Sequence, residues 1–501
     1  MHEPAPSKAA LARAAEAPFV RELWFAMGAS RIYIDLKLAQ LRIGLQPAAE
    51  REAAWRRTHA RVGNELYHLC ASRGGFFIKV GQFFSGRPDL VPIEWTLPLS
   101  ALCDAVEPVD GRLARAVAEM ELAHLGLGPL SEWVDQPLGS ASVAQVHAAR
   151  LAPRHRRWPL WGMANGMPVA VKVRRPDVHR FPRDLRAVRF AAGILQALEL
   201  DFDLVSGIDE LSERMAAELD LRNEYANTLS VGAKVSRLSR GAIVAPSALG
   251  ATERCLVVSL VDGVPLSMLA RGVAAEGAES AHSGALARLF AGRMLRALYK
   301  SYGQMILLGD GTFHADPHPG NLLVPSRPRT MLRALRAIAP PGIRALLPAP
   351  PPLLWLIDWG QCGGPMTAAR RAQLAELFLA LSESAGPSDT RGEARVATSL
   401  HALGVRTGEK TDEAAAAELA RGMFDAGTVL VVETKAQKAT SGSSSGLVET
   451  LPKDLFLVLR TTQMLRGLGA AAERAGAPPA GSLSRAWRPY ARRARAAAAA
   501  A

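Results

Sequence analysis

An aspartate and an asparagine in the C-terminal half of the chain have types and a spacing that suit proton transfer and metal binding. Asp316 stands five positions before Asn321 in the proline-stiffened segment His314-Ala315-Asp316-Pro317-His318-Pro319-Gly320-Asn321. A carboxylate in such a loop can accept a proton from a hydroxyl group or water, and the carboxamide oxygen can bind a metal ion. A plain Asp/Asn-rich turn with exposed histidines is the structural alternative, and the two histidines also permit a transition-metal site.

A second carboxylate and a lysine extend this set. Asp358 follows the apolar run 353–357 and precedes Trp359-Gly360, where its oxygens could hold a hard cation such as Mg²⁺. Lys172 ends an apolar run, so a strand would hold its amine against phosphate groups. A turn-capping aspartate and an exposed edge-strand lysine are the alternatives. The order of strand lysine, helix glutamate, D-x4-N and strand-D-W-G nevertheless matches the phosphoryl-transfer layout of protein-kinase-like folds.

The elements that must position these residues follow from the hydrophobic pattern. Three stretches show apolar residues near the helical period: 18–70, 111–125 and 185–235. Three others alternate or form short apolar runs that predict a small antiparallel sheet: 133–147, 169–173 and 255–261. The runs 321–324 and 353–357 predict a hairpin that brackets a Pro/Arg/Ala-rich excursion, Pro325 to Pro352. The remainder is predicted to be helical.

Three segments are interpreted as surface additions. They are a basic hairpin insertion at 154–167, a serine-glycine run from Ser441 to Gly446, and an arginine-alanine tail that begins at Arg485. We expect the tail to be solvated, although a cluster of arginines with aromatic residues could also bind anionic lipid or RNA.

Composition excludes several classes of protein. The chain has 501 residues, of which 49% are hydrophobic and 21% charged, with a formal net charge of +13. This rules out a mainly disordered chain and allows two or three packed cores. The charge permits nucleic-acid binding without requiring it, and we expect none. The four cysteines lie far apart without a CxxC pair, which predicts neither a zinc site nor a disulfide scaffold and favours a reducing compartment.

The sequence predicts no membrane-spanning helix. No window of eighteen residues is apolar and free of charge. The first 25 residues are more acidic than a typical transit peptide and too polar for a signal peptide, which leaves targeting open. The amphipathic helices over 18–45 are interpreted as a docking face, with peripheral membrane contact as the alternative.

Four further segments carry a specific resemblance. Gly75-Phe76-Phe77-Ile78-Lys79-Val80-Gly81-Gln82, continued by Ser85-Gly86-Arg87-Pro88-Asp89, resembles the KxGQ motif of the UbiB/ABC1/ADCK (AarF-domain) family of atypical kinases. Pro137 to His147 is similar to that family's alanine-rich nucleotide loop, and Glu218-Leu219-Asp220 to its ExD motif. Leu451 to Gly467 resembles its C-terminal region. The resemblance covers roughly residues 60–470.

By this resemblance, each residue of the set has an implied role. Lys172 contacts the α and β phosphates of ATP and pairs with Glu224. Asp316 takes the catalytic-base position, and Asn321 and Asp358 are the two Mg²⁺ ligands.

The resemblance also implies a nucleotide loop and a gate. The small residues of the loop would let its backbone approach phosphate closely: Gly139, Ser140, Ala141 and Ser142. Four residues form the gate, in which Glu218 and Asp220 hold Lys79 over the site: Lys79, Gln82, Glu218 and Asp220. An extension placed where a peptide substrate would lie argues for ATP hydrolysis or a small, lipid-like acceptor.

The implied fold class is α+β, a bilobal protein-kinase-like fold with a small N-lobe sheet, a mostly helical C-lobe and an N-terminal helical extension that carries the KxGQ motif. The expected divisions are an N-terminal helical region or targeting segment at 1–60, the KxGQ extension at 61–130, an N-lobe with the ExD insertion at 131–265, a C-lobe at 266–470, and a basic tail at 471–501.

The implied activity is Mg²⁺-dependent ATP binding and hydrolysis, or phosphoryl transfer to a non-protein acceptor. The implied role is support of isoprenoid-quinone (coenzyme Q or plastoquinone) biosynthesis or lipid homeostasis, peripheral to a membrane in a mitochondrion or plastid, or at a bacterial membrane. An isoprenoid or lipid ligand and quinone-biosynthesis enzymes are the implied partners.

Two alternatives come from other classes. One is a small-molecule phosphotransferase of the aminoglycoside or choline kinase type, which would lack the KxGQ and ExD segments. The other is a nucleotide-binding pseudoenzyme scaffold, against which the complete set of catalytic residue types argues.

Three positions depart from the family's pattern. Trp359 replaces the more usual phenylalanine, which the surrounding pocket must accommodate. Gly139 stands where many members have alanine, and Ser259 where a glutamate is common at the hinge between the lobes. We expect nucleotide affinity to be affected and the chemistry to be retained.

Overall fold

The computed structural model describes most of the chain. The described residues are 18–85, 91–104, 108–152, 166–199, 204–269, 281–326, 352–386, 388–408, 411–425 and 451–499. Four segments of the sequence interpretation lie outside these ranges in whole or in large part: 86–90 after the KxGQ motif, the basic insertion, the excursion after Pro325, and the serine-glycine run.

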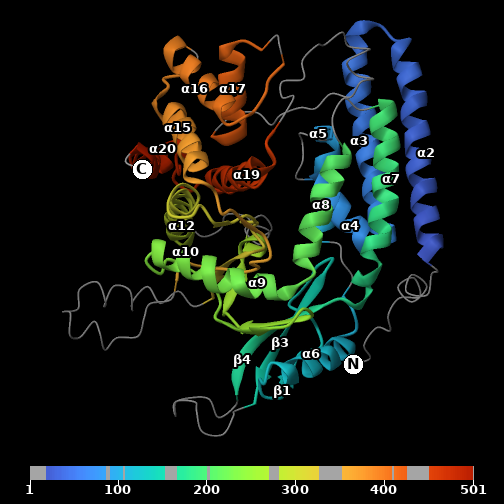
Figure 1. Cartoon of the computed structure of the whole chain (residues 1–501), viewed down its shortest axis with the longest axis vertical. Helices are drawn as coiled ribbons and strands as arrows, with labels where there is room; N and C mark the ends of the chain where they lie inside the picture. Colours follow the sequence, from blue (N-terminus) through green and yellow to red (C-terminus); the bar gives the residue numbers. More distant parts are fainter. Residues whose placement is uncertain are drawn as a thin grey trace.

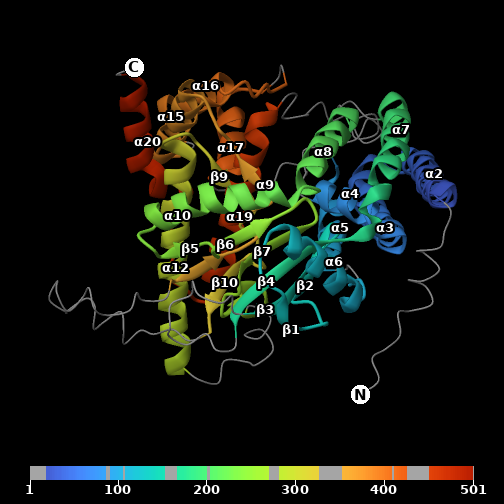
Figure 2. The same ribbon diagram turned by 60° about the horizontal axis from the view of Figure 1, so that its bottom comes forward.

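A small antiparallel sheet forms the N-lobe, as the alternating pattern predicts (Figure 2). Its strands are β1 (Leu130–Trp133), β2 (Gly139–Ser140), β3 (Ala144–Leu151), β4 (Met167–Arg174), β6 (Ala248–Ala251) and β7 (Cys255–Ser259). They are hydrogen-bonded in the order β1-β3-β4-β7-β6, and β2 pairs with β3. The central strand, β4, is the one that ends near Lys172.

Strand β4 sends alternate side chains to opposite faces of this sheet. Three of its valines are buried in a cluster with helix α6 (Gly111–His124): Val169, Val171 and Val173. Because the side-chain period of a strand is two residues, Lys172 lies on the other face. The sheet therefore shields its apolar side with α6 and presents Lys172 to the cavity between the lobes.

A tall group of helices stands beside the two lobes (Figure 1). It consists of α2 (Pro18–Gly44), α3 (Ala48–Arg73), α4 (Phe76–Ser85), α5 (Ile93–Ser100), α7 (Phe181–Glu199) and α8 (Leu204–Glu218). Phe76 and Phe77 of α4 are buried in one cluster with Phe181 of α7 and Ile208 of α8. This packing fixes α4, and with it Lys79, against the helices that precede the ExD segment.

The chain passes from this group into the C-lobe through three consecutive helical segments. They are α9 (Leu221–Asn227), a π-helical turn (Thr228–Gly232) and α10 (Ala233–Leu238). Asp220 caps α9, because its side chain accepts a hydrogen bond from the backbone N–H of Arg222. The cap fixes where the helix that carries Glu224 begins.

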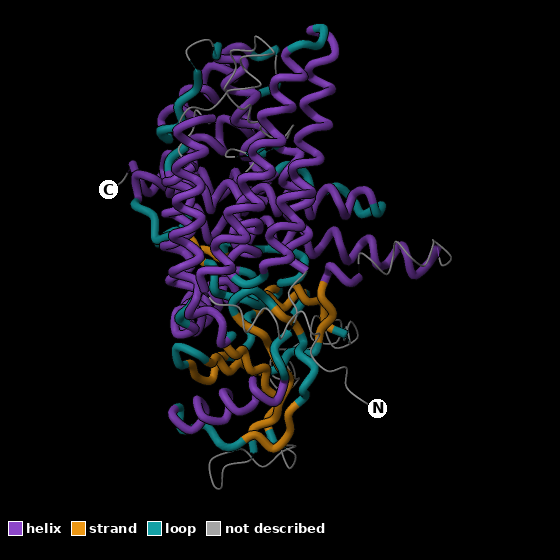
Figure 3. Tube along the Cα trace, turned by 90° about the vertical axis from the view of Figure 1, so that its right-hand side faces the viewer, coloured by secondary structure: helices purple, strands orange, loops and turns teal. Residues whose placement is uncertain are grey.

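The C-lobe is mostly helical. Its long helices are α12 (Ala281–Leu307), α15 (Ala368–Glu383), α16 (Thr390–Ala402), α17 (Glu413–Phe424) and α19 (Lys453–Arg474). Its short strands are β5 (Ile243–Val244), β8 (Gly263–Pro265), β9 (Phe313–His314), β10 (Leu322–Pro325), β11 (Leu354–Leu356) and β12 (Cys362–Gly363). One large hydrophobic cluster joins these helices and strands. Figure 3 shows the strands gathered at one end of the molecule and helices over the rest.

The predicted hairpin is confirmed by the pairing of β10 with β11. Leu322 lies opposite Leu356, and Leu323 opposite Trp355, in antiparallel register. The backbone N–H of Ile357 also donates to the carbonyl of Asn321 at 3.0 Å. The pairing therefore brings Asn321 and the segment that carries Asp358 together.

The prediction of a solvated C-terminal tail is wrong for residues 483–499. They form helix α20 (Leu483–Ala499), which packs on α15 and α12 (Figure 1). Four of its residues, at helical spacing, belong to the C-lobe core: Leu483, Trp487, Ala491 and Ala494. The Trp487 indole N–H also donates to the Tyr299 carbonyl at 2.8 Å. The arginines lie on the opposite side of the same helix, so basic composition concealed an amphipathic pattern.

The predicted fold class is confirmed: a small antiparallel sheet and a mostly helical lobe make a bilobal α+β structure with a helical N-terminal extension. Among the described helices, none is long and apolar enough to cross a membrane.

Candidate active site

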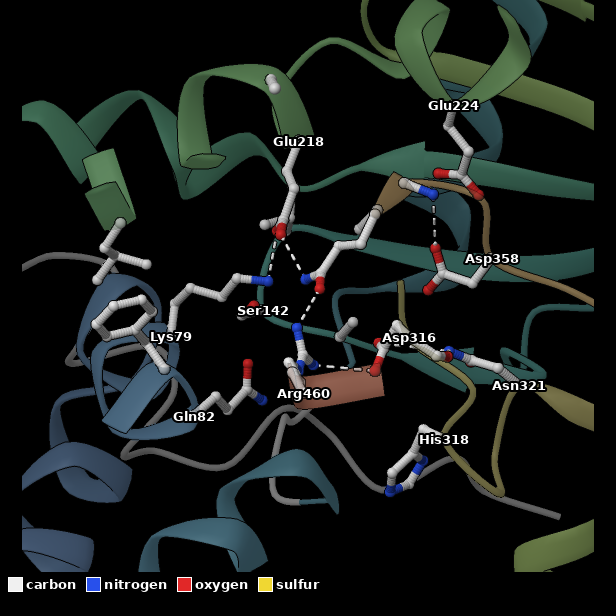
Figure 4. Close-up of a pocket in the computed structure, with 18 of the residues that line it drawn as sticks. Lys79, Gln82, Ser142, Glu218, Glu224, Asp316, His318, Asn321, Asp358 and Arg460 are labelled. Atoms are coloured by element: carbon white, nitrogen blue, oxygen red, sulfur yellow. Dashed lines mark hydrogen bonds and ion pairs between the residues drawn. The ribbon is translucent and has the colours of Figure 1, made fainter. Parts of the chain in front are cut away.

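A cavity of about 750 Å³ lies between the N-lobe sheet, the C-lobe and helix α4. Its volume falls within the range of pockets for small-molecule ligands. Four groups of elements meet there: β4 and the segment before β3, the helices α4, α8 and α9, the loops after β9 and β11, and α19. Figure 4 shows the charged side chains of these elements pointing toward one another.

Lys172 is bonded to two carboxylates at once. Its amine donates to Glu224 Oε2 at 2.7 Å and to Asp358 Oδ1 at 3.0 Å. The side chain of Glu224 is 7% exposed and that of Lys172 18%, whereas Asp358 is 45% exposed toward the cavity. We call these three residues the Lys172 triad.

Burial and charge act in opposite directions on the Lys172 triad. Burial disfavours the charged amine, but the negative charges of Asp358 and Glu224 outweigh it and raise the pKa of Lys172. Burial raises the pKa of Glu224 to about 7, and the charge of Lys172 offsets this only in part. Burial also opposes the charge of Asp358, yet the charge and hydrogen bond of Lys172 lower its pKa to about 2. At neutral pH the triad therefore holds a cationic amine beside an anionic Asp358.

The backbone at Asp358 is held in an unusual conformation. Its φ of 59° lies in the left-handed region, which aspartate tolerates better than most residues. The neighbouring Trp359 is buried, and its indole N–H donates to the carbonyl of Leu356 at 3.0 Å. Asn227 donates to the carbonyl of Trp359 at 3.0 Å. The pocket thus accommodates the larger ring with its polar atom satisfied.

The loop after β9 orders Asp316 and Asn321. His314 is buried, and burial lowers the pKa of its imidazole. Its Nδ1 lies 3.1 Å from the hydroxyl of Tyr302 and its Nε2 lies 2.9 Å from the carbonyl of Asp358, so a neutral ring donates from Nε2. Asn321 donates its amide N–H to the carbonyl of Asp316 at 3.1 Å. Its carbonyl oxygen is then the side-chain atom suited to a metal ion.

A second network starts at Lys79 and ends on Asp316. Lys79 forms an ion pair with Glu218, and Glu218 accepts a hydrogen bond from Gln361 at 2.8 Å. Gln361 in turn accepts from Arg460 of α19, and the other end of that guanidinium donates to Asp316 Oδ1 at 2.9 Å. We call these five residues the Lys79 network, and Figure 4 labels four of them, Lys79, Glu218, Arg460 and Asp316.

Asp220 and Gln82 line the cavity without joining the Lys79 network. The Asp220 carboxylate binds the guanidinium of Arg222 at 2.6 Å in addition to capping α9. The amide of Gln82 donates to the carbonyl of Leu102 at 3.0 Å, which joins α4 to the segment after α5. The structure therefore pairs Lys79 with Glu218 alone of the two ExD acids.

The predicted nucleotide loop divides in two. Ala141 and Ser142 line the cavity, whereas Gly139 and Ser140 form β2 and pair with β3. A Cβ atom built on Gly139 would meet no heavy atom within 4 Å. Alanine at this position therefore has room, and glycine is not required for close packing.

Two members of the Lys79 network, Gln361 and Arg460, were not among the residues singled out from the sequence. Gln361 directly follows the D-W-G triplet. Arg460 stands on α19 with Phe456 and Met464 four positions to either side, and all three line the cavity. A charged residue on such a helical face is the signal that could have indicated it.

The residues present suit a magnesium-nucleotide complex. Asp358 and Asn321 supply hard oxygen atoms, which Mg²⁺ prefers, and Lys172 supplies a fixed cation for phosphate. The donor set is oxygen-rich and contains no cysteine, which disfavours a soft metal. Both ring nitrogens of His314 are used within the protein, so this histidine is a structural residue.

Comparison with known proteins places the chain among kinase-like proteins. Residues 101–385 match the ABC1 atypical kinase-like domain. "Probable protein kinase UbiB" of Xanthomonas euvesicatoria is 32% identical over 296 residues, 57% of this chain and 48% of that protein. "AarF domain-containing protein kinase 1" of Xenopus tropicalis is 30% identical over 308 residues, 59% of this chain and 52% of that protein.

Among solved structures, Rv3197 of Mycobacterium tuberculosis in complex with erythromycin aligns with this chain at 19% identity and a TM-score of 0.46. The alignment covers 85% of this chain and 94% of the Rv3197 chain. The chain spans about half the length of the curated relatives it matches.

Proposed function

The chain belongs to the ABC1 atypical kinase-like family, and on this premise we propose that it is an ATP-dependent atypical kinase or ATPase. The observation that carries the proposal is the Lys172 triad. A strand-held lysine bonded to a helix glutamate and to a loop aspartate faces the same cavity as Asp316 and Asn321. This is the arrangement that positions phosphates and their metal ion in phosphoryl transfer.

Each residue then has a chemical task. Lys172 binds the α and β phosphates, and Glu224 holds its amine in place. Asn321 and Asp358 hold Mg²⁺, which supplies positive charge against the phosphates when bound. Because Lys172 and Asp358 now neutralise each other at 3.0 Å, nucleotide binding exchanges this contact for contacts to phosphate and metal.

Asp316 is the base that accepts a proton from the acceptor hydroxyl or from water. Arg460 occupies its Oδ1 at 2.9 Å, and the side-chain amide of Asn321 lies 3.5 Å from its Oδ2. Arg460 therefore orients the carboxylate, and it leaves Oδ2 as the oxygen that can accept a proton.

The acceptor is small or lipid-like, or it is water. Helix α4 and its Lys79 border the cavity, and by the family resemblance this extension stands where a peptide substrate would lie. Apolar side chains from three helices line the same part of the cavity: Phe83, Leu211, Phe456 and Met464. A hydroxyl group carried on an apolar body suits this lining better than a charged peptide does.

The biological role that we propose is support of isoprenoid-quinone biosynthesis or lipid homeostasis, peripheral to a membrane. It rests on the resemblance of the KxGQ and ExD segments and on relatives named UbiB. Quinone-biosynthesis enzymes are the corresponding partners.

A nucleotide-binding scaffold without turnover is the second candidate. The ion pair between Arg460 and Asp316 favours it, because a base bonded to a guanidinium is not free to accept a proton at that oxygen.

The two candidates are separated by Asp316→Asn. We expect the wild type to release ADP from MgATP and Asp316→Asn to lose this turnover while MgATP still raises its melting temperature. Asp454→Asn is the control, because Asp454 is also paired with an arginine, Arg370, and lies outside the cavity. Equal, background-level ADP release by all three proteins, with MgATP binding intact, would favour the scaffold.

A further inference from the structure

Helix α2 is apolar on two opposite faces. The inner face is buried or half-buried against α3, α4 and α7, and its residues recur every three or four positions: Phe25, Ala29, Ile32, Leu36, Ala39 and Ile43. This spacing is the one by which a helix packs along a neighbouring helix. One face of α2 therefore explains its attachment to the protein.

The opposite face repeats the same spacing in the open. Five of its side chains, together with Leu45 in the turn directly after the helix, are 44% to 89% exposed, and we call these six the outer seam: Trp24, Met27, Ile34, Leu38, Leu41 and Leu45. Arg31 occupies the position that the repeat leaves between Met27 and Ile34. At 3.6 residues per turn, the outer seam and the inner face point in roughly opposite directions.

A helix with apolar stripes on both sides is normally buried on both sides. Surface helices of single-chain proteins show one stripe, and isolated exposed apolar residues need no explanation. The outer seam is a second stripe and not a set of isolated residues, because it extends over 22 positions with the alternating three- and four-residue steps of a coiled coil. The positive charge of Arg31 in the middle of the outer seam restricts which partner can bind there and in which orientation.

We propose that the outer seam binds the outer seam of a second copy of this chain, with the two helices antiparallel. In this register Trp24 meets Leu41 of the second copy, and Met27 meets its Leu38. The pattern is self-complementary, as a two-fold interface requires. Each Arg31 then lies beside Asp35 of the second copy, whereas a parallel pair would place the two Arg31 side chains together.

The charges of the helix agree with this orientation. Arg31 is 72% exposed, and its ion pair with Glu65 spans 3.6 Å. Asp35 is 38% exposed, and its contact with Arg61 spans 3.8 Å. Both groups can therefore reach a new partner without breaking a short hydrogen bond.

The dimer surface lies one packing step from the candidate active site. Phe25, on the inner face of α2, stacks on Phe77 of α4 with ring centroids 4.2 Å apart. Phe77 precedes Lys79 by two residues on the same helix. Helix α2 therefore contacts both the proposed dimer surface and the helix that carries Lys79.

The mass of the full chain in solution tests the proposal. Light scattering after size exclusion should give twice the chain mass for the wild type and the single-chain mass for the Ile34→Asp/Leu38→Asp variant. Leu289→Asp is the control, because Leu289 of α12 is 55% exposed and lies off the outer seam. Far-UV circular dichroism should be unchanged, since the substituted side chains are exposed. A monomeric wild type, or a dimer that survives the double substitution, would overturn the proposal.

Cysteine pairs test the orientation. Met27→Cys/Leu38→Cys should form a disulfide-linked dimer on oxidation, and each single variant should not. The two positions lie about 16 Å apart along one helix, too far to link within one chain. Linkage by either single variant would indicate parallel helices and overturn the register. A wild type that stays monomeric but sediments with phosphatidylglycerol vesicles, and loses this with Ile34→Asp/Leu38→Asp, would assign the outer seam to lipid.

Discussion

The Lys172 triad and the Lys79 network occupy one cavity and are built alike at one end. Each begins with a lysine paired to a glutamate, and the two glutamates, Glu218 and Glu224, lie six positions apart at the junction of α8 and α9. Asp220 caps α9 between them. One capped turn of the chain therefore sets the positions of the two glutamates that pair with these lysines.

Their other ends differ. The triad closes on itself, because both carboxylates bond to the same amine. The Lys79 network is an open chain across α4, α8, the segment after Gly360 and α19, and it ends on Asp316. A change at α4 can therefore be felt at Asp316, while the triad is exposed mainly to what binds it directly. The predictions below test this separation.

The largest effect is expected at the centre of the triad. Lys172→Ala should lower kcat/KM for MgATP on the order of 100-fold, because a preorganised charge on the phosphates is lost. Glu224→Ala should lower it less, because the glutamate only positions the amine. Lys234→Ala is the control variant, because Lys234 is a comparably buried lysine that pairs with Asp310 outside the cavity. Steady-state ADP release measures all three variants, and equal values for Lys172→Ala and wild type would leave Lys172 as a structural lysine of the central strand β4.

A smaller effect is expected within the Lys79 network. Lys79→Ala should raise ATP turnover in the absence of acceptor, because an ammonium group leaves the cavity. In the Arg460→Ala background this increase should shrink, since the two residues are linked through Glu218 and Gln361. The coupling should be about 0.5 to 3 kcal/mol in a double-mutant cycle.

Arg370 offers a matched control for Arg460. Each is 21% exposed and bonds to an aspartate and a glutamine, but Arg370 lies outside the cavity. Lys79→Ala and Arg370→Ala should therefore act additively. If the effects of Lys79→Ala and Arg460→Ala on ATP turnover are additive as well, the network is a set of independent contacts.

The smallest effect concerns pH. Burial raises the pKa of Glu224 to about 7, above the value of an unfolded chain, so the folded state holds this proton more tightly. Its contribution to stability is full below the unfolded pKa and is lost as pH rises through about 7. Relative to Glu224→Gln, the wild type should thus lose melting temperature between roughly pH 5 and 8. If the melting temperatures of the two proteins change with pH in parallel, Lys172 keeps Glu224 ionised throughout this range.

Local pattern was enough for much of the fold. The sheet strands and the 321–357 hairpin follow from short apolar runs, and the helices of 18–70 from their period. Four residues share one cavity because each lies within two positions of the end of a strand: Lys172, Asp316, Asn321 and Asp358. A sequence motif can identify residues at the ends of strands, because the strand and the functional residue lie close together in the sequence.

Contacts between distant segments were not predictable in the same way. Arg460 lies 99 positions from Gln361 and 144 from Asp316, and no local period records such a pair. Helix α20 was missed for a different reason, because its arginines and alanines suggested low complexity while Leu483 and Trp487 carried the buried stripe. The partner of Lys79 could be proposed only because the resemblance supplied the ExD acids.

The central claim is that the Lys172 triad with Asn321 forms a site for a magnesium-nucleotide complex. Calorimetric titration with ATP, in excess Mg²⁺ and in EDTA, tests it most directly in the wild type and in Asp358→Asn. The wild type should bind ATP more tightly with Mg²⁺ than without it, and Asp358→Asn should lose this difference while keeping the far-UV spectrum of the wild type. Tight, Mg²⁺-dependent binding by Asp358→Asn, equal to that of the wild type, would contradict the account.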